Sequence, residues 1–152
     1  MANLLNYSLF TGLDRHPEAL QELSALLRER EFRAREFLID EKLNDNSLYF
    51  LVSGQVVINK MGEEGRIVLL GRADAKNFPH FGEGAILGKV RKIANVVAYT
   101  DCRCLVLSAK DFETFAARHP VAMASIYRNI ASRLFDHLSK TTKDVFIAGM
   151  NA

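Results

Sequence analysis

The stretch "SLYFLVSGQVVINK", residues 47–60, contains two short apolar runs that are separated by Ser53 and Gly54. Both runs are rich in aromatic and β-branched residues, which fit a pleated strand better than a helix. Serine and glycine are frequent turn formers. The stretch therefore predicts two strands that are joined by a turn at Gly54.

Comparable runs lie on either side of this pair of strands. From Glu31 to Ser108 the sequence alternates between short β-branched or aromatic segments and segments rich in Gly, Asn and Asp. Several strands at short intervals, with no helices between them, indicate an antiparallel sandwich or barrel. At 152 residues the chain fits one domain, residues 1–152, with a β-region at about 31–108.

A helical pattern precedes the β-region. In "HPEALQELSALLRER" the leucines recur at helical spacing after Pro17, which predicts a helix over about 17–29. Asp14 is the expected cap of this helix. A shorter helical piece is expected at Leu4–Phe10.

Two further helices are predicted after the β-region, over about 109–145. Ser108 and Asp111 resemble a capping box, and Pro120 is suited to open the last helix. That last helix carries two apolar stripes, the first made by Met123, Ile126, Ile130, Leu134 and Leu138 and the second by Tyr127, Ala131 and Phe135. So wide an apolar arc predicts either packing on the body and on a second subunit, or one broad core contact.

Composition excludes several classes of protein. A net charge of +2 is too small to indicate bulk nucleic-acid binding. No apolar run approaches the ~20 residues of a membrane span, and no signal peptide is evident. Cys102 and Cys104 are expected to be small core residues, which fits a reducing cytoplasm. No nucleophile–base pair, metal spacing or cofactor motif is present, so we expect no catalytic residues, no metal and no cofactor.

Four segments in order resemble the cyclic nucleotide-binding domain family: "LFTGLD" (9–14), the opening stretch, "FGEGAIL" (81–87) and "TDCRCLVLSAKDF" (100–112). The resemblance implies a mainly β fold with flanking helices (α+β). Its core would be an antiparallel β-roll of the cyclic-nucleotide-binding type, a double-stranded jelly-roll. N-terminal helices and a long C-terminal helix would complete it.

The resemblance also implies a site, because "FGEGAIL" is similar to the start of the family's phosphate-binding cassette. Gly82 would let the backbone approach a ligand, and Glu83 would accept a hydrogen bond from a ribose hydroxyl. "GAIL" would form a short helix whose amides, including that of Ala85, favour a phosphate. His80 is expected to be a loop residue. The candidate ligand-binding residues are Phe81, Gly82, Glu83, Gly84, Ala85, Arg91, Lys92 and Ile93.

The second half of the cassette departs from the family pattern of proline, then arginine. Aligned without a gap, the proline position falls on Arg91 and the arginine position on Lys92. Strand alternation places Lys92 on the small-residue face with Ala94, Val96 and Ala98, so Lys92 is predicted to point inward. A one-residue bulge would bring Arg91 inward instead, and both alternatives stay open.

Two functions are consistent with this sequence. The first is a stand-alone, non-enzymatic sensor of cAMP or cGMP that signals through its C-terminal helix to a partner or to the other subunit of a homodimer. The second is a degenerate, nucleotide-independent interaction module of the same fold. Few residues follow Lys140, so no DNA-binding domain is expected, and no membrane contact is expected either.

Overall fold

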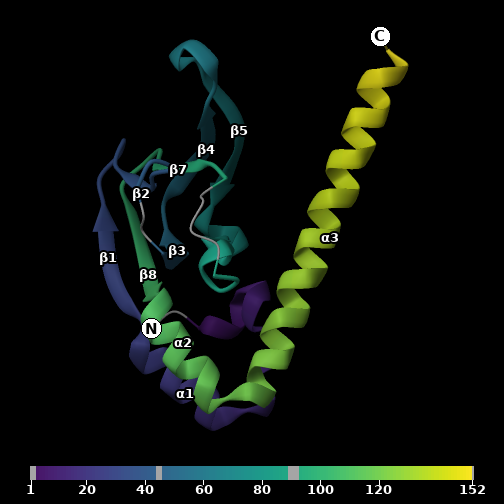
Figure 1. The fold of residues 1–152 in the computed structure, drawn as a ribbon. Helices are drawn as coiled ribbons and strands as arrows, with labels where there is room; N and C mark the ends of the chain where they lie inside the picture. Colours follow the sequence, from purple (N-terminus) through teal and green to yellow (C-terminus); the bar gives the residue numbers. More distant parts are fainter. Residues whose placement is uncertain (1–2, 44–45, 89–92, 152) are drawn as a thin grey trace.

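The computed structural model describes residues 3–43, 46–88 and 93–151 (Figure 1). Over these residues, the strands form two antiparallel sheets of four strands each. The first sheet has the order β1 (Arg28–Phe32), β8 (Cys102–Ser108), β3 (Ser47–Ser53) and β6 (His80–Phe81). The second has the order β2 (Phe37–Ile39), β7 (Asn95–Ala98), β4 (Gln55–Met61) and β5 (Ile67–Asp74). The predicted antiparallel β-roll with flanking helices is confirmed.

Strands β3 and β4 follow the opening stretch closely, and Gly54 lies between them with φ +90°. A Cβ at this position would overlap the Asp101 carbonyl oxygen and would lie 2.7 Å from the Cys102 Sγ atom. Only glycine satisfies both the backbone conformation and this close approach.

Strand β3 connects the two hydrophobic clusters of the molecule. Leu48 and Phe50 belong to the cluster that includes the N-terminal segment, α2 and α3, and Leu51 belongs to the cluster inside the roll. Alternate side chains of a strand point to opposite faces, so one strand contributes to both cores. Cys102 and Cys104 are free and buried inside the roll, as predicted, and burial raises the pKa of Cys104 to about 12.

Three short 3-10 helices, η1 (Leu4–Asn6), η2 (Ser8–Phe10) and η3 (Leu13–Arg15), precede helix α1 (Pro17–Leu26). The prediction that Asp14 caps α1 is wrong, because Asp14 lies inside η3 and the N-cap residue is His16. Helix α1 also ends before residue 29, because Arg28 already pairs with Val106 in the first sheet.

Helix α2 (Ala109–Arg118) begins after Ser108, whose side chain caps it as predicted. The Asp111 amide donates to Ser108 Oγ (3.1 Å), and the Ser108 hydroxyl donates to Asp111 Oδ2 (2.8 Å). Helix α3 (Pro120–Met150) starts at the predicted proline and continues past residue 145.

Only the first half of α3 packs on the body, and the second half extends away from it beside the roll (Figure 1). Met123, Ile126 and Ile130 are buried, and the Asn129 side chain donates to the carbonyl oxygens of Leu9 and Thr11. The rest of both predicted stripes is exposed at Tyr127, Ala131, Leu134, Phe135 and Leu138. The alternative in which α3 makes one broad contact with the chain's own core is therefore wrong. None of the described helices has both the length and the apolar character needed to cross a membrane.

Candidate functional site

A cavity of about 650 Å³ lies between the roll and α3, within the size range of small-molecule sites. Strands β2, β4 and β7 contribute Ile39, Ile58 and Val96 to one wall. Residues 80–84 and Leu87 form a second part of the lining, and α3 adds Arg133, Leu134 and His137. The cavity is thus an apolar space with a few charged groups around it.

The cavity brings together many of the predicted site residues. Phe81, Gly82, Glu83, Gly84 and Ile93 line it. Ala85 belongs to the single 3-10 turn η6 (Glu83–Ala85), which is shorter than the helix expected for "GAIL" and has little helix dipole. Arg91 and Lys92 lie outside the described residues. Their direction, and the ligand-binding roles of all eight positions, stay predictions.

Gly82 is constrained by the protein itself. Its φ is +92°, and an added Cβ would overlap the carbonyl oxygen of Ser47 on β3. We expected this glycine to make room for a ligand. In the structure the absent side chain makes room for the backbone of β3, next to Glu83.

Strand β7 and Ala94, which precedes it, agree with the alternation argument. Val96 and Ala98 are buried, and Ala94 lines the cavity, so the small-residue face points inward. Asn95 is buried as well, although strand alternation places it on the face opposite to Val96. Its side chain accepts a hydrogen bond from the Glu41 amide (2.8 Å) and donates to Asn59 Oδ1 (3.1 Å), and these bonds satisfy its polar atoms.

The prediction that His80 is a loop residue is wrong. His80 is in β6, where it pairs with Phe50, and its exposed fraction is 0%. Burial and the neighbouring Arg133 lower the pKa of His80 to about 3, so the ring is neutral at ordinary pH.

Glu83 is held by the histidine and by helix α3. Its Oε1 atom lies 3.1 Å from His80 Nδ1 and 3.1 Å from Arg133 Nε. A second nitrogen of Arg133, Nη2, donates to the His80 carbonyl oxygen (3.2 Å). The guanidinium therefore ties α3 directly to the start of the cassette.

Sequence reasoning missed Arg133, although a signal was present. Arg133 follows Ile126 and Ile130 at helical spacing, so it continues the stripe that the protein buries. A single basic residue on a buried stripe needs a partner of opposite charge, and Glu83 provides it. His137, one helical turn beyond Arg133, also lines the cavity.

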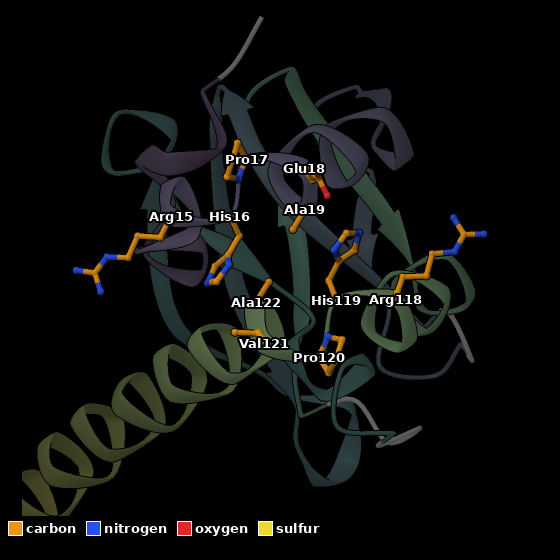
Figure 2. A pocket seen from close by; sticks show the side chains of 10 residues that line it. All are labelled: Arg15, His16, Pro17, Glu18, Ala19, Arg118, His119, Pro120, Val121 and Ala122. Carbon is orange, nitrogen blue, oxygen red and sulfur yellow. The ribbon is translucent and has the colours of Figure 1, made fainter.

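A second hollow, of about 400 Å³, lies where the start of α1 meets the junction of α2 and α3 (Figure 2). Figure 2 shows the Arg15 side chain extending away from the other labelled residues. Glu22 Oε1 and Oε2 lie 2.9 Å from Arg118 Nη1 and 2.8 Å from His119 Nε2. Hydrogen bonds from His119 and Arg118 lower the pKa of Glu22. Arg118 and His119 thus already have Glu22 as a partner, so this hollow is a helix junction.

No metal centre is evident in the part of the chain that the structure describes, since no three His, Cys, Asp or Glu residues there form a group that could hold an ion. The charged groups of the cavity are Lys60, Glu83, Arg133 and the titratable His137, a set suited to binding a polar ligand.

The sequence pattern of the cyclic nucleotide-binding domain matches residues 29–119, more than half of the chain. The chain belongs to the cyclic nucleotide-binding domain family. It is 28% identical over 127 residues to a protein of Rhodopseudomonas palustris named as a potassium channel, covering 83% of this chain and 30% of that protein.

A human relative has a similar level of identity. The chain is 27% identical over 133 residues to potassium/sodium hyperpolarization-activated cyclic nucleotide-gated channel 1, covering 87% of this chain and 14% of the channel. The chain therefore spans less than a third of the length of these curated relatives.

Solved structures share the fold. The catabolite activator protein of Thermus thermophilus has a TM-score of 0.76 at 22% identity, covering 93% of this chain and 63% of that one. The N-terminal domain of a transcriptional regulator from Streptomyces coelicolor has a TM-score of 0.75 at 23% identity. The match covers 91% of this chain and 95% of that one. The regulatory subunit of a cAMP-independent protein kinase A from Trypanosoma brucei has a TM-score of 0.63 at 24% identity. The match covers 86% of this chain and 48% of that one.

Proposed function

We propose that this chain is a regulatory, non-enzymatic module that senses a cyclic purine mononucleotide, cAMP or cGMP, and signals through α3. The observation that carries the proposal is the contact between Glu83 and Arg133. It joins the expected ribose-binding carboxylate directly to the C-terminal helix at the edge of a cavity of suitable size. A ligand that binds beside Glu83 therefore lies against the helix that would transmit the signal.

The chemistry of the cavity supports this class of ligand. A carboxylate accepts hydrogen bonds from a ribose hydroxyl, and the apolar side chains of Ile39, Ile58 and Val96 suit the flat face of a purine. Lys60 offers one positive charge, and the predicted cassette cations Arg91 and Lys92 would supply the contact with the cyclic phosphate.

Calorimetric titration of the purified protein with cAMP and cGMP tests the proposal. We expect saturable binding that Glu83→Gln weakens by about 10- to 100-fold, because a hydrogen bond to a charged group contributes about 1.5–3 kcal/mol. Glu64→Gln is the matched control, since the Glu64 side chain is 82% exposed and lies at the tip of the β4–β5 hairpin. Comparing Lys92→Ala with Arg91→Ala identifies the phosphate contact.

A wild-type protein that releases no heat at high micromolar cAMP and cGMP would exclude the sensor. The chain would then be the nucleotide-independent interaction module. Two observations favour that second function. The cassette lacks the family's proline–arginine pair, and a structural relative at 24% identity is the regulatory subunit of a cAMP-independent kinase.

We further propose that α3 joins two copies of this chain in a homodimer. The exposed apolar residues Tyr127, Leu134, Leu138 and Val145 are spaced by seven, four and seven residues, which is a heptad seam. This seam differs from the buried face formed by Met123, Ile126 and Ile130. A half-helix without tertiary contacts is marginal in water, so a second helix along the seam would stabilise it.

Light scattering tests the dimer. We expect the wild-type protein to have twice the monomer mass and Leu138→Glu to be monomeric, because an unpaired charge in a helix seam opposes association. Ser139→Glu adds the same charge beside the seam and should leave the dimer intact. A wild-type monomer at high concentration would contradict the proposal.

We also propose a reducing, cytoplasmic location, which the free buried thiols Cys102 and Cys104 support.

A further inference from the structure

Lys60 continues a row of inward-facing side chains on strand β4. Val56 is buried, and Ile58 and Lys60 both line the cavity, so alternate residues of this strand face the inside of the roll. The first two members of the row are apolar, and the third is a cation. Lys60 is still exposed, so its ammonium group is accessible to a ligand that enters the cavity.

The register of the second sheet places Lys60 beside the second half of the cassette. Asn59 pairs with Asn95, and one further step in this antiparallel register brings Lys60 opposite Ala94, which also lines the cavity. The Asn95 side chain is already engaged, because it accepts from the Glu41 amide (2.8 Å) and donates to Asn59 Oδ1 (3.1 Å). Lys60 is therefore the polar side chain that this pair of strands offers to the cavity.

The charges in the described lining of the cavity do not cancel. Arg133 has Glu83 as its partner, with Arg133 Nε 3.1 Å from Glu83 Oε1. Burial lowers the pKa of His80 to about 3, so its ring is neutral. Across residues 3–43, 46–88 and 93–151, no acidic side chain lies within ion-pair distance of the Lys60 ammonium and no hydrogen bond engages it. A ligand with one negative charge would supply the missing partner.

We propose that Lys60 binds the negative charge of the ligand from strand β4. The identity of that ligand rests on the proposed function, whereas its charge follows from the cavity alone. A cyclic mononucleotide carries one negative charge on its phosphodiester. A phosphate monoester carries about 1.5 to 2 at pH 7, and a nucleoside carries none. One unpaired lysine, which binds phosphate as a point charge, therefore matches the cyclic phosphate best.

Three substitutions test Lys60 by calorimetric titration with cAMP and cGMP. Lys60→Met removes the charge and keeps an unbranched side chain, and we expect it to weaken binding about 10-fold or more, comparable with one hydrogen bond to a charged group. Lys60→Arg keeps the charge and should stay within about 3-fold of wild type. Lys110→Met is the matched control and should bind as wild type does, because Lys110 is exposed on α2, outside the lining of the cavity.

The two nucleotides separate a contact with the phosphate from a contact with the base. Guanine presents an acceptor oxygen, O6, where adenine presents an amino donor. Equal losses of affinity for cAMP and cGMP in Lys60→Met are expected, because both ligands carry the same cyclic phosphate. A loss for cGMP alone would place Lys60 at the base and overturn the inference. Unchanged binding of both nucleotides would overturn it as well.

If the wild-type protein binds neither nucleotide, the proposed function fails, and a second pair of probes tests Lys60 separately. Anilinonaphthalene sulfonate is an apolar molecule with one negative charge, and phenylnaphthylamine is its uncharged analogue. In fluorescence titrations, Lys60→Met should weaken binding of the sulfonate and leave binding of the uncharged analogue unchanged. Equal effects on both probes, no effect, or no binding of the sulfonate would refute the role of Lys60. The same pair of probes is used if only one nucleotide binds.

Discussion

Replacing Gly82 with alanine is expected to lower the free energy of unfolding by at least about 3 kcal/mol and to abolish the proposed nucleotide binding. Two effects combine at this position. The backbone has φ +92°, which strains any residue with a Cβ, and the new Cβ would overlap the Ser47 carbonyl oxygen. Because that oxygen belongs to strand β3, relief requires the cassette to move, and Glu83 moves with it.

Gly12→Ala separates the two effects. Gly12 has a similar φ of +85°, and no atom lies within 4 Å of an added Cβ. We expect this control to lose only about 1 kcal/mol, the usual penalty of a left-handed residue. Urea denaturation of both variants measures the difference. Equal losses would show that Gly82 is required for its backbone conformation alone.

Acid is expected to destabilise the protein through His80. The ordinary pKa of 6.5 applies in the unfolded chain, and the folded pKa is about 3. Below pH 6.5 the unfolded chain therefore binds a proton that the folded protein does not, and stability falls as the pH falls from 6.5 toward 3. Each pH unit in this window corresponds to about 1.4 kcal/mol, so at pH 4.5 the loss from this one residue approaches about 2–3 kcal/mol.

Urea denaturation at pH 7.5, 5.5 and 4.5 measures this dependence. Other groups also titrate in this range, so the comparison that matters is with His80→Asn, which cannot take up the proton. The wild-type protein should lose more stability than the variant between pH 7.5 and 4.5. Parallel losses would mean that His80 is protonated in the folded protein without penalty, contrary to its complete burial beside Arg133.

The elements that the sequence predicts well are those whose causes are local. The turn at Gly54 and the helix cap at Ser108 each depend on residues within a few positions of one another. The alternation of side chains in β7 and the start of α3 at Pro120 also depend on neighbouring residues alone. The prediction for Asp14 failed because a 3-10 turn competed for the same residues.

The residue patterns predicted an antiparallel sandwich or barrel with flanking helices, and the resemblance to the family specified the β-roll and the cassette start at Gly82 and Glu83. The surroundings of Glu83 depend on tertiary packing. Arg133 lies fifty positions further along the chain, and it reaches the carboxylate because Ile126 and Ile130 anchor α3 against the body. His80 becomes a buried junction because β6 pairs with β3 while η2 and α3 contribute Ser8 and Arg133. Such contacts depend on the packing of separate elements, which local spacing does not encode.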